Sequence, residues 1–322
     1  MTTPTATLQT FQAIGNREDL TDAIYQISPT STPFVTMTSR VTAKGKYHEW
    51  QTTALPAAAT NALIEGDTFV ARTSQTTTRI GNHCQILSDV IGVSRTQEAV
   101  NKAGRDSEIA WQLTRSAQKL KRDLEYAAVR NQASTAGAAA SARTMASVES
   151  WLTTNDTSIG GGAGATTGFS GTTVAAPTDG TQIATFSEAL LKSVISQVWQ
   201  QGGDPRVVMT GPTQKQRAST FTGIATLFRD TGSTAAGTRI VGAADVYVSD
   251  FGEHRIVPSR FNRDRTILVL DMDYWAMAWL DGWKKTKLGV VADAEQWAIT
   301  GEVTLECRNE AANGKIADVL TV

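Results

Sequence analysis

A stripe of apolar residues at helical spacing runs from Arg105 to Arg130. Charged residues fill the other faces of this stretch, and the stripe consists of Ile109, Leu113, Leu120, Leu124 and Ala128. The pattern predicts one helix of about 26 residues, which at ~1.5 Å per residue is a rod of roughly 40 Å. Because only one side is apolar, we expect the helix to pack on that side. Its basic residues are then left to solvent, a neighbour or a polyanion: Arg115, Lys119, Lys121 and Arg122.

The chain before this helix is β-rich and short of apolar residues. Residues Met1 to Ser39 contain one short helical candidate, Arg17 to Ile27, followed by a proline-containing stretch typical of an extended arm. The stretches Val41 to Leu55 and Thr68 to Val93 are rich in β-branched residues and predict a long polar ribbon. Such a ribbon is marginally stable alone in water, so it either lies on a neighbouring subunit or is an ordinary surface hairpin.

The composition changes twice after the long helix. From Asn131 to Gly180 the chain is rich in Ala, Gly, Ser and Thr, and we expect this to be its least ordered part. Beyond it the pattern predicts a helix from Phe186 to Gln201 and a buried strand from Arg206 to Met209. A second helix and three short strands are predicted to follow. This order is typical of a small mixed sheet flanked by helices.

The last fifty residues are predicted to be mainly strands. The segment Trp275 to Trp283 fits either a helical stripe or a strand, and its short length between acidic turn residues favours a strand. Alternating apolar residues between Trp297 and Cys307 predict further long strands. Asn313 followed by Gly314 predicts a tight turn.

Composition and charge narrow the classes of function. The 30 Lys and Arg residues nearly balance the 31 Asp and Glu residues, which argues against a basic field for tight, specific nucleic-acid binding. The sequence opens without a signal-peptide pattern, and no apolar run approaches the ~20 residues of a membrane helix, so we expect a soluble protein. Cys84 and Cys307 are far apart in sequence, and we expect both to be buried and reduced.

Few residues suggest catalysis. The run from Gly160 to Gly168 lacks the Lys and the Ser or Thr of a phosphate-binding loop. Ser116 and Lys119 have the Ser-x-x-Lys spacing of some serine acyltransferases, but a packed serine beside a solvated lysine explains them better. The histidines are isolated and select no general base: His48, His83 and His254.

Ligand binding has equally little support. Asp271 and Asp273 have oxygen ligands suited to a hard cation, although turn residues at the end of a strand show the same pattern. Lys44 and Lys46, near the ribbon, are explained as charges that block pairing at a strand edge. The sequence therefore predicts no catalytic residue, no cofactor and no metal.

Several segments, taken in order, resemble those of a known family. They are EDLTDAIYQISPTSTPF, KYHEWQTTAL, EGDTF, EIAWQLTRSAQKLKRDLEYAAV, PRVVMTGPTQKQRAS, VYVSDFGEHRIVPSRF, LDMDYWAMAWLDGW and TGEVTLECRNEAANGKI. Their joint order, over nearly the whole chain, resembles the major capsid proteins of tailed bacteriophages.

The resemblance implies an α+β fold of the Hong Kong 97 type, divided into five parts. These are an N-terminal arm (1–39), an extended β loop (40–93), a peripheral domain with a long spine helix and a glycine-rich loop (94–180), an α/β axial domain (181–285) and a return to the peripheral domain (286–322). On this mapping the candidate inter-subunit contacts are basic residues: Lys44, Lys46, Arg79, Arg115, Lys119, Lys121 and Arg122.

The resemblance also implies a function. A major capsid protein assembles with copies of itself, as pentamers and hexamers, into an icosahedral virion shell around double-stranded DNA that it binds without sequence specificity. The expected partners are portal and decoration proteins and, because the arm-like sequence begins almost at Met1, a separate scaffold or none. Synthesis in the cytoplasm of a bacterial host is expected. The alternatives are an encapsulin-like protein nanocompartment of the same fold and, remotely, a cytoplasmic serine hydrolase using Ser116 and Lys119.

Overall fold

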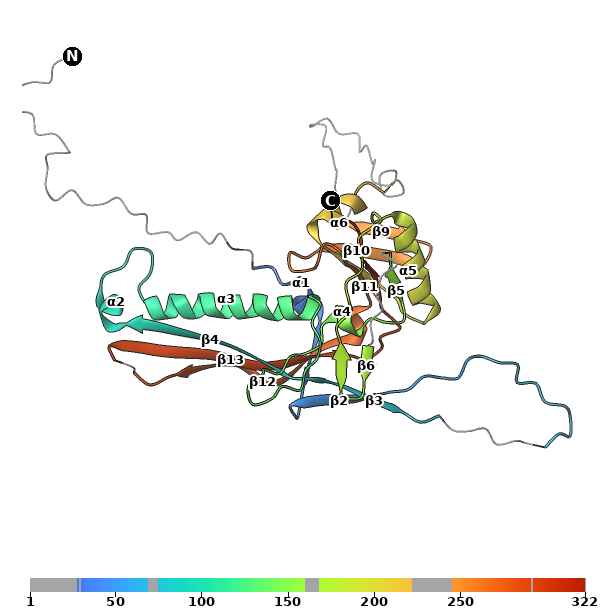
Figure 1. Ribbon diagram of the computed structural model, residues 1–322, viewed down its shortest axis with the longest axis horizontal. Helices are drawn as coiled ribbons and strands as arrows, with labels where there is room; N and C mark the ends of the chain where they lie inside the picture. Colours follow the sequence, from blue (N-terminus) through green and yellow to red (C-terminus); the bar gives the residue numbers. More distant parts are fainter. Residues whose placement is uncertain are drawn as a thin grey trace, which may run out of the picture.

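The computed structural model describes residues 28, 30–68, 75–159, 168–221, 245–290 and 292–321. The helix expected from Arg17 to Ile27 and most of the run from Gly160 to Gly168 lie outside these residues. The described chain forms an elongated half and a compact half, and a hairpin projects from near their junction (Figure 1).

The elongated half is a four-stranded sheet with one long helix lying along it (Figure 1). In the strand order β1-β12-β13-β4, β1 is parallel to β12 and the other neighbours are antiparallel. The elements are β1 (Ser39–Thr42), β4 (Gln85–Ser94), β12 (Trp275–Lys287), β13 (Ala294–Cys307) and the helix α3 (Glu108–Val129). The long one-sided helix and the strand at Trp275 are both confirmed.

The ends of α3 follow from its flanking residues. Ser107 has an extended backbone, and its hydroxyl accepts a hydrogen bond from the Ala110 N–H at 3.2 Å, so the helix begins three residues later than Arg105. Arg130 is again extended and ends it. Two short helices precede it in the chain, α1 (Pro33–Met37) and α2 (Arg95–Ala99).

The compact half is a six-stranded mixed sheet in the order β5-β14-β11-β8-β10-β9. Its strands are β5 (Asp156–Ser158), β8 (Val207–Thr210), β9 (Val246–Ser249), β10 (Gly252–Pro258), β11 (Ile267–Leu270) and β14 (Gly314–Ala317). The helices α5 (Glu188–Gln200) and α6 (Pro212–Ala218) and the 3-10 helix η1 (Met272–Tyr274) accompany them. The two predicted helices and the buried strand before α6 are confirmed.

Strand pairing crosses the boundaries expected from the resemblance. The range 181–285 ends inside β12, which pairs with β1 and β13 of the elongated sheet. The strands β5 and β14 join the six-stranded sheet, although both lie outside that range. The chain therefore passes between the elongated and the compact half more often than the five consecutive ranges indicate.

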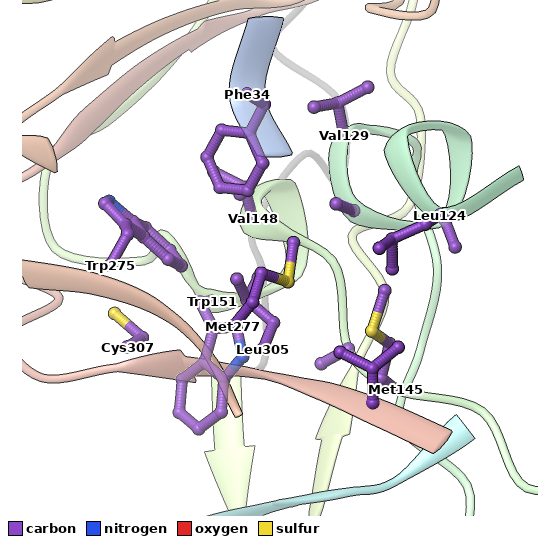
Figure 2. Packing of buried hydrophobic residues seen from close by; sticks show 14 of the residues in the cluster. Phe34, Leu124, Val129, Met145, Val148, Trp151, Trp275, Met277, Leu305 and Cys307 are labelled. Atoms are coloured by element: carbon purple, nitrogen blue, oxygen red, sulfur yellow. The ribbon is translucent and has the colours of Figure 1, made fainter. Parts of the chain in front are cut away.

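One hydrophobic core lies where α3 meets the four-stranded sheet, and Figure 2 shows part of it. Phe34 of α1 packs edge-on against Trp275 of β12, with ring centroids 6.1 Å apart. The C-terminal half of α3 and the inner faces of β12 and β13 supply Leu124, Val129, Met277, Leu305 and Cys307. A second core, built on α5, fills the compact half.

The expectation that Asn131 to Gly180 is the least ordered part is wrong for its described residues. Three of its side chains, Met145, Val148 and Leu152, are fully buried in the main core. The segment also forms a helix and a small hairpin: α4 (Val148–Trp151), β6 (Gly168–Ser170) and β7 (Thr173–Ala175). Small residues here allow close packing, which their composition alone did not distinguish from a loop.

The predicted tight turn at Asn313 and Gly314 is also wrong. The turn lies at residues 311–312, and Gly314 already begins β14. Asn313 is fully buried, and its Oδ1 accepts hydrogen bonds from the Asp271 N–H at 2.8 Å and the Trp275 Nε1–H at 2.9 Å. The Asn313 side chain thus accepts hydrogen bonds from two buried N–H groups at the start of η1 and β12. These partners are distant in the sequence, so a local pattern does not show this role.

Candidate inter-subunit surfaces

The projecting hairpin carries apolar side chains that the chain itself leaves uncovered. It consists of β2 (Tyr47–Thr52) and β3 (Thr78–His83), joined by a loop whose described residues, 53–68 and 75–77, are all exposed. Leu55 is 93 %, Leu63 61 % and Ile64 79 % exposed. Large apolar side chains concentrated on one exposed segment indicate a surface that another protein covers.

The root of this hairpin is fixed to the main core. The Trp50 ring lies 5.5 Å from that of Trp151, and its Nε1–H donates to the Cys307 carbonyl at 2.9 Å. His48 Nε2 lies 3.0 Å from a carboxylate oxygen of Glu306. Burial would raise the pKa of Glu306, but hydrogen bonds from His48 and Arg308 outweigh it and lower the pKa. The loop therefore projects from a firmly held base.

A buried carboxylate ties α1 to the long helix α3. The two carboxylate oxygens of Glu125, on α3, accept hydrogen bonds from the backbone N–H groups of Phe34 and Val35 at 2.9 and 2.8 Å. Burial raises the pKa of Glu125 to about 7, although both hydrogen bonds favour the ionised form. These two hydrogen bonds fasten the start of α1 to α3.

The residues proposed for hydrolase chemistry both bind an aspartate. The Ser116 hydroxyl donates to Asp89 Oδ2 at 2.7 Å, and the Lys119 ammonium donates to Asp89 Oδ1 at 2.6 Å. These bonds lower the pKa of Asp89 against the effect of its burial, and the bond to Asp89 raises the pKa of Lys119. A protonated lysine is no base for Ser116, so the group fastens α3 to β4.

Replacing Asp89 with alanine is expected to lower the free energy of unfolding by about 1–2 kcal/mol, because the buried Ser116 hydroxyl loses its acceptor. Urea unfolding of the isolated chain measures this loss. Ser88→Ala, on the neighbouring exposed residue of the same strand, is the matched control and should change the value by less than about 0.5 kcal/mol. Equal losses for both variants would contradict the role assigned to Asp89.

The other basic candidates lie on two surfaces. Lys44 and Lys46 are exposed just before the hairpin, and Arg79, within it, pairs with Glu49 at 3.0 Å. On α3, Lys121 is exposed, the Arg115 guanidinium lies 4.6 Å from the Trp111 ring centroid, and Arg122 lies 5.8 Å from that of Phe261. The structure therefore brings these residues to no common site but distributes them over the hairpin and the helix.

The remaining candidates for chemistry have structural roles. Asp271, half of the suggested cation site, caps η1 and accepts hydrogen bonds from the backbone N–H groups of Asp204 and Asp273 at 3.1 and 3.2 Å. No three His, Cys, Asp or Glu side chains gather as metal ligands within the described residues. Cys84 and Cys307 are free and buried as predicted, and burial raises the pKa of Cys84 to about 11.

Three features of these surfaces were not predicted from the sequence: the buried Glu125, the Trp50 anchor of the hairpin and the exposed apolar residues of its loop. Glu125 is one of many charged residues in a predicted amphipathic helix, and nothing local marks it as buried. Trp50 is the one signal available in advance, because an aromatic residue in an otherwise polar strand suggests an anchored face. The exposure of Leu63 and Ile64 follows from the position of the hairpin in the fold.

Comparison with known proteins assigns the chain to a family. The family model of the SU10 major capsid protein matches residues 3–320. The chain belongs to this family. The major capsid protein of Escherichia phage Phieco32 is 25% identical over 336 aligned residues, which cover 93% of each chain. This family consists of structural capsid proteins and is not a class of enzymes.

Solved structures show the same fold. The capsid of the native GTA particle matches with a TM-score of 0.61 and 12% identity, covering 97% of each chain. The structure from Mycobacterium phage Bobi matches with a TM-score of 0.61 and 10% identity, covering 94% of this chain and 95% of the other. The predicted α+β fold of the Hong Kong 97 type is confirmed.

The SU10-family chain is therefore a phage major capsid protein, a structural component of the virion shell that associates with copies of itself. No helix in the described part of the chain is long and apolar enough to span a membrane.

Proposed function

We propose that this capsid protein assembles as pentamers and hexamers that close into an icosahedral shell around double-stranded DNA. The observation that carries the proposal is the exposed loop of the β2–β3 hairpin, with Leu55, Leu63 and Ile64 facing solvent in the single chain. Burying three large apolar side chains contributes about 1.5–3 kcal/mol each, so contacts with neighbouring copies stabilise the assembled form. The chain belongs to a family of major capsid proteins, so we infer that these contacts form within a capsid shell.

The parts of the chain have distinct roles in this assembly. Residues 1–39 act as the arm, the hairpin loop within 40–93 reaches a neighbouring copy, and α3 is the spine of the peripheral domain. The six-stranded half is the axial domain that meets its copies at the capsomer centre. The exposed basic residues of α3, Arg115 and Lys121, face neighbours or the packaged DNA.

A triple substitution tests the role of the loop. Leu55→Asp, Leu63→Asp and Ile64→Asp together should leave a folded chain that sediments only as small species, because the apolar contacts are lost and the three positions are exposed. The matched control places three aspartates at exposed positions of the same loop, Thr53, Ala58 and Thr60, and should still assemble. Sedimentation velocity and circular dichroism measure assembly and folding. Assembly of the triple variant at the wild-type level would refute the proposal.

The DNA content of the particles separates the capsid from a protein nanocompartment. Near-zero net charge is compatible with a container that retains DNA by confinement, because no cationic lining is then needed. Nuclease-treated virions should release double-stranded DNA when they are opened. Particles with a protein-dominated absorbance spectrum and a co-purifying enzyme would contradict DNA packaging and identify a compartment.

Other phage proteins complete this proposed function. A portal, decoration proteins and a separate scaffold are the expected partners, with synthesis in the bacterial host cytoplasm. The capsid structure of phage G, which contains gp27 major capsid proteins and gp26 decoration proteins, matches this chain with a TM-score of 0.54 and 10% identity. That match supports a decorated shell as one form of the assembly.

A further inference from the structure

One side of α3 carries a row of aromatic and basic residues. Trp111, Arg115, Arg122 and Tyr126 follow one another at spacings of four, seven and four positions. These spacings place them along one side of a helix with 3.6 residues per turn. Arg130, which ends the helix, continues the row four positions later. We call Arg115, Arg122 and Arg130 the basic ridge.

The basic ridge lies on the side of α3 that faces away from the core. Leu120 and Leu124, two positions before and after Arg122, lie roughly on the opposite side of the helix and are buried in the main core. Arg115 is exposed, and Tyr126, within the same row, is 50 % exposed. The described part of the chain therefore leaves this side of α3 open to a partner.

Aromatic rings hold the guanidinium groups of the ridge. The guanidinium carbon lies 4.6 Å from the ring centroid for Arg115 over Trp111, 5.8 Å for Arg122 over Phe261 and 4.8 Å for Arg130 over Tyr126. Among the described residues none of the three arginines has an ion pair or a side-chain hydrogen bond, and the Nε atoms of Arg122 and Arg130 are buried without a partner. A ring positions a cation without neutralising its charge, so the N–H donors stay available.

The carboxylates of α3 do not neutralise the ridge. Glu108 is buried and pairs with Arg105 at 2.5 Å. Glu125 is buried and accepts its hydrogen bonds from the backbone of α1. Asp123 is exposed, but it lies four positions after Lys119, on the neighbouring side of the helix. The three arginines thus form a local cationic surface on a chain whose net charge is only -1.

The composition of the ridge fits a polyanion better than it fits a protein. The centre of a protein interface is depleted in charge and rich in apolar surface, whereas this row is built around three cations. The ridge spans 15 residues of helix, about 22 Å at ~1.5 Å per residue. Double-stranded DNA carries one negative charge per ~1.7 Å of its axis, so phosphates are available along the whole ridge. Each phosphate suits the planar donor fork of a guanidinium.

We propose that the basic ridge binds the phosphate backbone of the packaged double-stranded DNA without reading its sequence. The inference rests on the proposed function, because the DNA in question is the DNA that the shell encloses. Three phosphate contacts from one copy give only weak binding. Many copies in one shell contact the same duplex, so the weak contacts act together.

The salt dependence of DNA binding tests the ridge. A labelled duplex of about 30 base pairs is titrated with the unassembled full chain, and binding is followed by fluorescence anisotropy. Three phosphate contacts predict a slope of about -2.7 for log affinity against log salt concentration, or a roughly 40-fold loss of affinity between about 50 and 200 mM NaCl. Arg115→Gln, Arg122→Gln and Arg130→Gln together should reduce the size of this slope by about 2.7.

Two further variants separate the charge of the ridge from its contribution to folding. Replacing the same three arginines with lysine keeps the three charges and should keep the wild-type slope. Arg115→Gln alone, at an exposed position, should reduce the size of the slope by about 0.9, and it decides the question if circular dichroism shows that the triple variant is unfolded.

The matched control removes three positive charges from exposed positions elsewhere, by Lys44→Gln, Lys46→Gln and Arg255→Gln. It should keep the wild-type slope. Equal slopes for wild type and the glutamine variants of the ridge would overturn the inference. Binding of poly-glutamate in place of the duplex would also overturn it and identify an acidic protein as the partner. The titration uses the unassembled chain, so a failure to form closed particles would contradict the proposed function and leave this test of the ridge unaffected.

Discussion

Replacing Trp275 with alanine is expected to lower the free energy of unfolding by about 3–5 kcal/mol, a loss at the upper end of the range for single substitutions. The side chain is 0 % exposed, packs against Phe34 and donates its indole N–H to Asn313 Oδ1 at 2.9 Å. The substitution opens a cavity in the main core and removes a buried hydrogen bond in one step. It also weakens the contact between α1 and the sheet.

Urea unfolding of the isolated chain measures this effect, and Trp199→Ala is the control. Trp199 has the same side chain but is 55 % exposed, with one aromatic contact to Phe251 at 5.1 Å. Its loss should be about 1 kcal/mol, the size of one aromatic pair. Equal losses for the two tryptophans would show that the core around Trp275 is not the main source of stability.

The second large effect is a pH dependence that arises from Glu125. Because the folded chain raises the pKa of this carboxyl from 4.5 to about 7, the folded state binds its proton more tightly than the unfolded state does. Its contribution to stability is therefore fully present below pH ~4.5 and is lost as the pH rises to ~7. A pKa difference of this size corresponds to about 3 kcal/mol.

The variant Glu125→Gln isolates this contribution, since glutamine does not titrate. The measured quantity is the difference in free energy of unfolding between wild type and variant. This difference should fall by about 3 kcal/mol between pH 4.5 and 7 and stay constant above pH 8. Parallel pH curves for the two proteins would exclude Glu125 as the titrating group. Glu49→Gln, at an exposed position of the hairpin, should follow the wild-type curve.

Local patterns predicted the elements whose amphipathicity is complete within one segment. The stripe from Ile109 to Ala128 identified α3, because one side of a long helix carries the apolar residues, which are half-buried in its first half and buried in its second half. Alternation around Trp275 and Met277 identified β12, whose inner face lies in the core. In both segments the large apolar residues repeat with the period of the secondary structure, so the sequence alone contains the signal.

Features that depend on distant partners were not predictable in this way. Glu125 accepts a hydrogen bond from Phe34, which is 91 positions away in the sequence. Within the sequence of its own helix, Glu125 cannot be distinguished from the other charged residues. Asn313 has the local signature of a turn, yet its amide binds Trp275 and Asp271 in the core. A pocket lined by residues such as Val93, Ala99, Ile109 and Glu295 combines four elements, β4, α2, α3 and β13, so no single segment of the sequence contains its lining.

Negative-stain electron microscopy of the purified wild-type chain is the most direct measurement of self-assembly into a shell. Closed isometric particles built from pentamers and hexamers are expected, because the exposed loop of each copy is covered only when neighbours surround it. Discrete small oligomers under every condition of salt, pH and concentration would contradict the shell.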